Sequence, residues 1–102
     1  GLPTDKFTFL GFLPRKKGPL AMLLQQCSTA PGITYIAFES PHRLLRSLQN
    51  FTEVYGNAVQ ISVGRELTKL HEEITKGTPE ELIETLGSKR IRGELTLTWR
   101  AA

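Results

Sequence analysis

Two short polar segments carry the side chains that could do chemistry. The first is Glu39-Ser40-Pro41-His42-Arg43, and the second runs from Gly64 to Glu73. Each follows an apolar stretch typical of a strand, and open α/β sheets place their ligands beyond strand ends. Histidines and carboxylates can accept a proton near neutral pH, and arginines bind anions. The two segments are therefore the first candidates for a functional site.

The charged residues of these segments allow more than one interpretation. Arg43 falls at the third position of an expected helix, where the helix dipole disfavours a cation, so it is a candidate for binding an anion. Exposure to solvent, or an ion pair with Glu39, explains it equally well. The charges of residues 64–73, taken alone, are more typical of a solvated loop. His42 and His71 have no identified partner and cannot be assigned as bases.

The spacing of apolar residues predicts the elements that hold these segments. In particular, the apolar run Phe7 to Leu13 predicts a buried strand, and Ser40 with Pro41 predicts the N-cap and first turn of a helix. The expected elements in chain order are a strand at 7–13, a helix at 20–27, a strand at 33–38, a helix from 41 to 55, a strand at 59–63, an edge strand at 72–76, a helix capped by Thr78-Pro79-Glu80-Glu81, and a strand at 95–99. This alternation predicts an α/β fold with an open mixed sheet of about five strands flanked by helices.

Composition narrows the class of protein. With 102 residues, 39% of them hydrophobic, the chain is expected to form one folded domain. No apolar run approaches the roughly 20 residues of a membrane helix, and no signal peptide is recognisable, so we expect a cytoplasmic protein without a membrane partner. The single Cys27 predicts neither a disulfide nor a metal site. The net charge of +3 permits an anionic partner. The missing initiator methionine is expected for part of a longer chain.

Five segments, read together, resemble one family. They are Gly-Leu-Pro-Thr-Asp at 1–5, Gly-Phe-Leu-Pro-Arg-Lys-Lys-Gly at 11–18, Glu-Ser-Pro-His-Arg-Leu at 39–44, Gly-Arg-Glu-Leu-Thr-Lys-Leu-His-Glu-Glu at 64–73, and Lys-Gly-Thr at 76–78. In this order they resemble ribosomal RNA small subunit methyltransferase I (RsmI), in the tetrapyrrole methylase superfamily. The resemblance implies S-adenosylmethionine as the methyl donor and a cytidine ribose of 16S ribosomal RNA, in the small ribosomal subunit, as the acceptor. It also implies that residues 1–102 are a C-terminal domain, inactive without an N-terminal domain.

The resemblance also implies roles for individual residues. Positions expected beside the cofactor are Phe38, Glu39, Arg65, Glu66, Leu67, Glu94 and Leu95. Positions expected to contact RNA are Arg15, Lys16, His42, Arg43, Lys69 and His71. Candidates for a general base are Glu39, Glu66, His42 and His71, with none preferred, so the catalytic residue stays unknown. The sequence departs from the family after Gly18, where Pro19-Leu20-Ala21-Met22 replaces an expected basic helix.

Other functions fit part of the same pattern. A tetrapyrrole methylase would share the fold, although segments 39–43 and 67–73 favour the ribosomal branch. A module that binds RNA without catalysis would show affinity that falls steeply with salt. A dimerisation domain is a further alternative, since relatives in the superfamily form pairs.

Overall fold

The structure, a computed structural model, describes residues 6–30, 32–68 and 71–100. Its elements are β1 (Lys6–Phe12), α1 (Lys17–Ser28), β2 (Ile33–Glu39), α2 (Leu44–Tyr55), β3 (Ile61–Thr68), β4 (His71–Gly77), α3 (Pro79–Leu86) and β5 (Leu95–Arg100). The strands form a five-stranded sheet in the order β1-β2-β5-β3-β4. β1 and β2 are parallel, and the other three pairs are antiparallel. The predicted α/β class and mixed sheet are confirmed.

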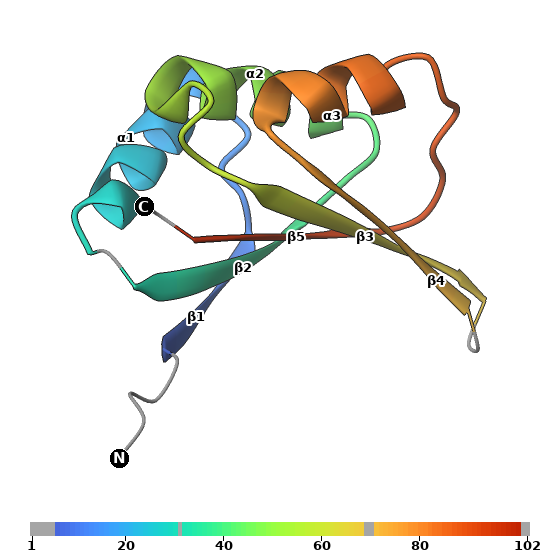
Figure 1. The fold of residues 1–102 in the computed structure, drawn as a ribbon, viewed down its shortest axis with the longest axis horizontal. Coiled ribbons are helices and arrows are strands. Elements are labelled where there is room, and N and C mark those ends of the chain that lie inside the picture. The colour runs from blue at the N-terminus through green and yellow to red at the C-terminus, as the bar shows by residue number, and fades with distance from the viewer. Residues whose placement is uncertain (1–5, 31, 69–70, 101–102) are drawn as a thin grey trace.

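All three helices cover the same face of the sheet, and the core lies between them and the central strands (Figure 1). The alternating residues Leu95, Leu97 and Trp99 of β5 point into this core and are almost completely buried. Two tyrosine hydroxyls attach α1 to it: Tyr35 Oη donates to the carbonyl of Cys27 at 3.3 Å, and Tyr55 Oη donates to the carbonyl of Leu24 at 2.5 Å. The helical layer is thereby fixed to one side of the sheet.

The opposite face of the sheet is open, and β1 lies at its edge. The prediction of a strand there is confirmed, but its expected burial is wrong. The side chains of Phe7, Phe9 and Phe12 are 61, 60 and 59% exposed. Phe9 and Phe12 contact Phe38 of β2, with ring centroids 5.1 and 5.6 Å apart. An apolar run predicts a strand, but it does not specify how many layers cover that strand.

The start of α2 also differs from the prediction. Ser40 is not its N-cap: α2 begins at Leu44, and Arg43 occupies the N-cap position without a capping side-chain bond. The reason is that the carboxylate of Glu39 accepts the Ser40 N–H at 2.8 Å, and the Arg43 N–H donates to the Ser40 carbonyl at 3.1 Å. These bonds form a turn before the helix. Arg43 therefore precedes the helix instead of occupying its third position.

The other predicted elements are confirmed, and two strands extend further than predicted. Thr78 caps α3 through a reciprocal capping box with Glu81, as expected. The second polar segment is not a loop for most of its length, because Gly64 to Thr68 belong to β3 and His71 to Glu73 belong to β4. β4 is the predicted edge strand, lengthened to residues 71–77. In the described part of the chain, no helix has the length and apolar character needed to span a membrane.

Candidate functional site

Leu95 is the centre of the candidate site. It pairs with Glu39 of β2 on one side and with Arg65 of β3 on the other. Residues paired across a sheet point to the same face, so these three side chains face the helices. Three segments that are distant in the sequence therefore meet in one row at the end of the sheet where β2 ends and β5 begins.

The remaining positions expected beside the cofactor lie around this row. Phe38 and Glu66 are neighbours of Glu39 and Arg65 and point to the open face, because successive strand residues alternate. Glu94 is exposed and directly precedes β5. The backbone of Leu67 continues β3, while its side chain lies outside the described residues. The predicted set is thus brought to one region but divided between two faces.

Glu39 is the most buried charged residue of this region, at 0% exposure. Its carboxylate accepts hydrogen bonds from the Ser40 N–H at 2.8 Å, from Arg43 Nε at 3.2 Å and from Ser47 Oγ at 2.5 Å. A buried carboxylate needs such partners, since an uncompensated charge would be costly. Glu39 therefore connects the end of β2 to the turn at 40–43 and to α2.

A cavity of about 420 Å³ opens beside Glu39. It is lined by Phe12, Glu39, Ser40, Pro41, His42, Arg92, Gly93 and Glu94. The hydroxyl of Ser40 is buried and has no hydrogen-bond partner among the described residues. Gly93 adopts a φ of 85°, a conformation that favours glycine and brings bare backbone to the cavity wall. We call this space the Ser40 cavity; it has one unsatisfied polar group and an exposed carboxylate at its rim.

A second cavity, of about 360 Å³, lies between the β3–β4 hairpin, the end of α3 and the connection that follows it. Its polar lining comes from Arg65, Glu73, Thr75, Lys89 and Arg90, and its apolar lining comes from Val63, Leu86, Ile91 and Leu95. Arg65 Nη2 and Glu73 Oε2 form an ion pair at 2.9 Å. We call this the Arg90 cavity. Both cavities therefore border the row of paired residues described above. Glu39 lines the Ser40 cavity, whereas Leu95 and Arg65 line the Arg90 cavity.

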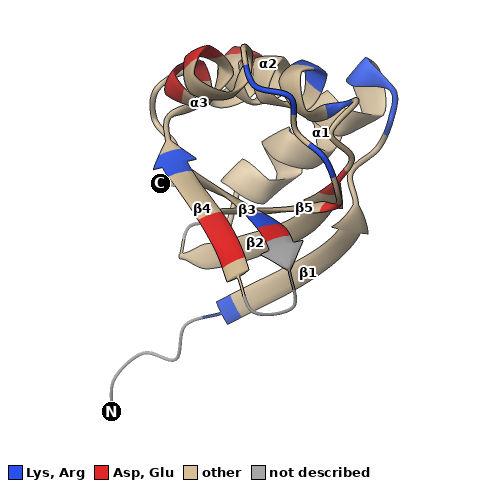
Figure 2. Cartoon of the chain, turned by 90° about the vertical axis from the view of Figure 1, so that its right-hand side faces the viewer, with Lys and Arg blue, Asp and Glu red and all other residues tan. Residues whose placement is uncertain are grey.

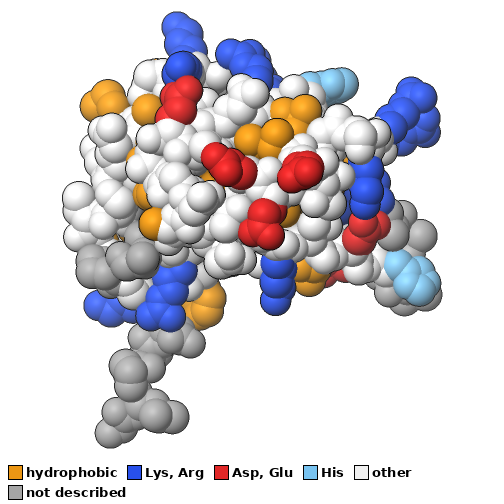
Figure 3. Space-filling model, turned by 45° about the horizontal axis from the view of Figure 1, so that its top comes forward, with side chains coloured by type: hydrophobic (Ala, Val, Ile, Leu, Met, Phe, Trp, Pro, Cys, Tyr) orange, Lys and Arg blue, Asp and Glu red, His pale blue; other side chains and the backbone are white. Residues whose placement is uncertain are grey.

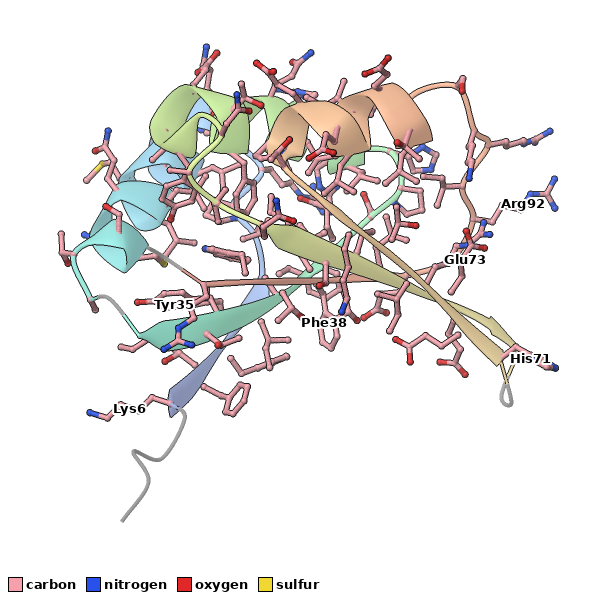
Figure 4. All side chains as sticks on the ribbon, viewed as in Figure 1. Lys6, Tyr35, Phe38, His71, Glu73 and Arg92 are labelled. Atoms are coloured by element: carbon pink, nitrogen blue, oxygen red, sulfur yellow. The ribbon has the colours of Figure 1, made fainter. Side chains whose placement is uncertain are left out.

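The residues expected to contact RNA do not form one cluster. Arg15 and Lys16 are exposed between β1 and α1, and His42 is exposed at the Ser40 cavity. Arg43 forms an ion pair with Glu39 through Nε, which is the pairing that the sequence left open. The two histidine side chains occupy separate patches (Figure 3), and His71 lies far along the β3–β4 hairpin, past Glu73 (Figure 4). Lys69 lies outside the described residues.

The connection from α3 to β5 carries basic side chains that are not among the positions expected from the sequence to contact RNA. Lys89, Arg90 and Arg92 are all exposed there. Figure 2 shows this connection and the basic turn before α1 as blue segments on one side of the molecule. The available signal was the run Lys89-Arg90-Ile91-Arg92 next to a glycine, which places three cations within four residues. The strand-end side of the sheet is therefore predominantly basic.

The described residues contain no group of histidine, cysteine and carboxylate side chains that could hold a metal ion. The chemistry available at this end of the sheet is instead anion binding by arginine and lysine, hydrogen bonding by Ser40, and proton transfer by His42 or Glu94.

Comparison with known proteins identifies relatives of the whole described fold. No family model matches the chain. Proteins named ribosomal RNA small subunit methyltransferase I match it from Halalkalibacterium halodurans (41% identity, 95% of this chain and 33% of that protein), Hydrogenobaculum sp. (40%, 95% and 41%) and Thermotoga maritima (38%, 95% and 42%). The match covers a C-terminal part of these relatives. The chain thus spans about a third to two fifths of their length.

Proposed function

Because the chain belongs to the ribosomal RNA small subunit methyltransferase I family, whose C-terminal part it matches, we propose that residues 1–102 are the C-terminal domain of a two-domain methyltransferase. The enzyme transfers a methyl group from S-adenosylmethionine to the ribose 2′-hydroxyl of a cytidine in 16S ribosomal RNA. The domain is inactive by itself and works with an N-terminal domain, in the cytoplasm. The observation that carries this proposal is identity near 40% along 95% of the chain.

The Ser40 cavity fits a role in holding the methyl donor against the N-terminal domain. The Ser40 hydroxyl is buried and unpartnered, and a rotation about its Cα–Cβ bond would bring it to a polar group of the cofactor. Phe12 can contact an apolar ring. Close backbone approach is possible at Gly93, which has no Cβ. Glu94 at the rim provides a carboxylate for a cationic or hydroxyl-bearing group. When bound, S-adenosylmethionine supplies the methyl group.

Among the candidate general bases, the geometry favours His42. The carboxylate of Glu39 is buried and already accepts three hydrogen bonds, so it holds the turn in place. Glu66 and His71 line neither cavity. His42 is exposed and lines the Ser40 cavity, where it can accept the proton of an approaching hydroxyl. Positioning of the two substrates supplies the larger part of the rate, and a base adds a factor of roughly 10² to 10⁴.

The RNA substrate is proposed to approach the basic side of the molecule. Arg15 and Lys16 of the turn before α1 and Arg92 of the connection before β5 are exposed there. Exposed cations position an RNA backbone through its phosphates without reading its sequence. His42 and Arg92 both line the Ser40 cavity, so RNA bound by these cations would bring a ribose to the methyl donor.

The deciding experiment is methyl transfer from labelled S-adenosylmethionine to 30S ribosomal subunits, using the chain together with its N-terminal domain. Label that makes a cytidine ribose resistant to alkaline cleavage would support the proposal, because 2′-O-methylation removes the nucleophile of that cleavage. The chain alone is the matched control and should give no label.

Two alternatives would give different results in the same assay. Transfer to a porphyrin or corrin in place of the subunit would indicate a tetrapyrrole methylase. RNA binding without transfer to either acceptor would indicate a non-catalytic module. A homodimer is compatible with each of these functions, and sedimentation at two protein concentrations detects it.

A further inference from the structure

We propose that the Arg90 cavity binds one unstacked nucleotide of single-stranded RNA, with its base against the apolar lining and its phosphate at Lys89 and Arg90. This inference rests on the proposed function and adds a binding site outside the Ser40 cavity. The site is formed by the β3–β4 hairpin, the end of α3 and the connection to β5.

The shape and lining of the cavity fit a base. Its volume of about 360 Å³ lies in the range of about 300–1,000 Å³ that is common for small-molecule pockets. Val63, Leu86 and Leu95 are buried and form an apolar inner surface, while Ile91 is partly buried at its edge. The flat face of an unstacked base could lie on such an apolar surface. The polar edge of the base would stay in contact with water and keep its hydrogen bonds.

The charges at the cavity favour a phosphate. Lys89 and Arg90 are exposed and form no ion pair with other described residues. The carboxylate of Glu73 is compensated by Arg65 at 2.9 Å, and the remaining N–H groups of that guanidinium are available as donors. The lining therefore has two uncompensated positive charges, next to an apolar surface.

This combination distinguishes single-stranded from double-stranded RNA. In a duplex the bases are stacked and only the backbone and shallow groove are accessible, whereas an unpaired nucleotide can place its base in a pocket. Single strands are commonly bound by basic grooves with adjacent aromatic side chains, and aliphatic side chains would take that place in the Arg90 cavity. A duplex would reach Lys89 and Arg90 but could not place a base against Ile91.

The charge contribution is tested in the complete protein with the double variant Lys89→Ala/Arg90→Ala. The matched control is Lys6→Ala/Lys76→Ala, which also removes two exposed cations but changes neither cavity. The measurement is the affinity for a short single-stranded oligoribonucleotide at several salt concentrations. We expect about a tenfold loss for the cavity variant, with the slope of log affinity against log salt reduced by about 1.4. Equal losses in both variants would overturn the proposal.

The base contribution is tested with an oligonucleotide of the same length that has one abasic position. The unmodified protein should bind the intact strand about fivefold more tightly, which corresponds to a stacking or apolar contact of about 1 kcal/mol. The variant Ile91→Ser should lose most of this preference. Equal affinity of the unmodified protein for both strands would refute the cavity as a nucleotide site.

These outcomes are independent of those that test the methyltransferase. If the unmodified protein methylates 30S subunits but the cavity variant binds RNA normally, only the present inference fails. If the cavity variant loses RNA affinity while no methyl transfer to any RNA is found, the inference stands and the proposed catalytic function fails. Measuring the affinity for S-adenosylmethionine in each variant provides the control for folding, since it should be unchanged.

Discussion

The carboxylate of Glu39, at the end of β2, accepts a hydrogen bond at 3.2 Å from Nε of Arg43, in the turn that joins β2 to α2. Because Glu39 is completely buried whereas Arg43 is partly exposed, the arginine compensates a charge that has no access to water. The pair, with Ser47, fixes the turn on which Ser40 and His42 lie. The ion pair between Glu39 and Arg43 therefore helps to hold the candidate site in its shape.

Replacing Arg43 should therefore affect stability. We expect Arg43→Ala to lower the free energy of unfolding by about 2 kcal/mol, the usual effect of losing a hydrogen bond to a charged group. Adding Glu39→Gln to this variant should recover part of the loss, since the uncompensated charge is removed. Urea denaturation measures the free energy of unfolding of the single and the double variant. Arg46 is exposed, so Arg46→Ala is the control and should leave this free energy almost unchanged. Unchanged stability of Arg43→Ala, with weaker RNA binding, would instead indicate a direct contact with RNA.

Ser40 and Ser47 provide a matched pair of substitutions. The hydroxyl of Ser40 is buried without a protein partner, so Ser40→Ala should change the free energy of unfolding by less than about 0.5 kcal/mol. The same variant should bind S-adenosylmethionine several-fold more weakly in the complete protein. Ser47→Ala removes a hydrogen bond to Glu39 and should destabilise by about 2 kcal/mol. Titration calorimetry and denaturation separate the two effects. Unchanged cofactor affinity in Ser40→Ala would argue against the cofactor role of this cavity.

The cap of α3 predicts a loss of stability in acid. Thr78→Ala should cost about 1 kcal/mol, because the Thr78 hydroxyl accepts the Glu81 N–H. The hydrogen bond from the Thr78 N–H lowers the pKa of Glu81 below its ordinary value of 4.5. A lowered folded-state pKa stabilises the fold above pH 4.5, and this stabilisation disappears as pH falls through the folded-state value. The stability difference between the unmodified protein and Glu81→Ala should therefore shrink below pH 4.5. If the stability difference between these two proteins were constant from pH 7 to pH 3, the lowered pKa of Glu81 would be contradicted.

Tyr55 predicts a loss of stability in alkali. Burial raises the pKa of Tyr55 from 10 to about 12, since the phenolate is disfavoured away from water. A raised folded-state pKa gives stability that is complete below pH 10 and is lost as pH rises towards 12. Tyr55→Phe should cost about 1 kcal/mol at neutral pH, through loss of the bond to the Leu24 carbonyl, and should reduce the alkaline loss. Thermal unfolding from pH 8 to pH 11 tests both, and identical pH profiles of the two proteins would exclude this role of Tyr55.

Local patterns in the sequence were sufficient for most elements of the fold. The alternation of Leu95, Leu97 and Trp99 predicted β5, and Thr78 with Glu81 predicted the start of α3, because both signals depend on neighbours a few residues away. The N-cap at Ser40 was mispredicted because residues 40–43 form a turn, closed by the Arg43 N–H donating to the Ser40 carbonyl, and the Ser40 hydroxyl bonds no N–H of the helix. Local propensity gave no indication that the Glu39 carboxylate would be buried.

The candidate site was predictable only in part, because it is assembled by pairing between distant strands. The resemblance pointed to positions 39, 65 and 95, but their contact follows from β5 lying between β2 and β3. The two cavities depend on the same strand order and on the path of residues 88–94. Nothing in a basic run such as residues 89–92 distinguishes a solvated linker from the wall of a cavity.

The exposed phenylalanines of β1 have a practical consequence for the conditions in which the chain is handled. Phe7, Phe9 and Phe12 give the open face of the sheet an apolar surface. Lys89 and Arg90 are exposed elsewhere, at the Arg90 cavity. Added salt weakens attraction between cations and phosphate, whereas sulfate salts strengthen apolar association. Raising the concentration of ammonium sulfate should therefore favour self-association of the chain and release of RNA at the same time. A buffer that preserves the proposed RNA binding is then also expected to keep the chain from self-associating.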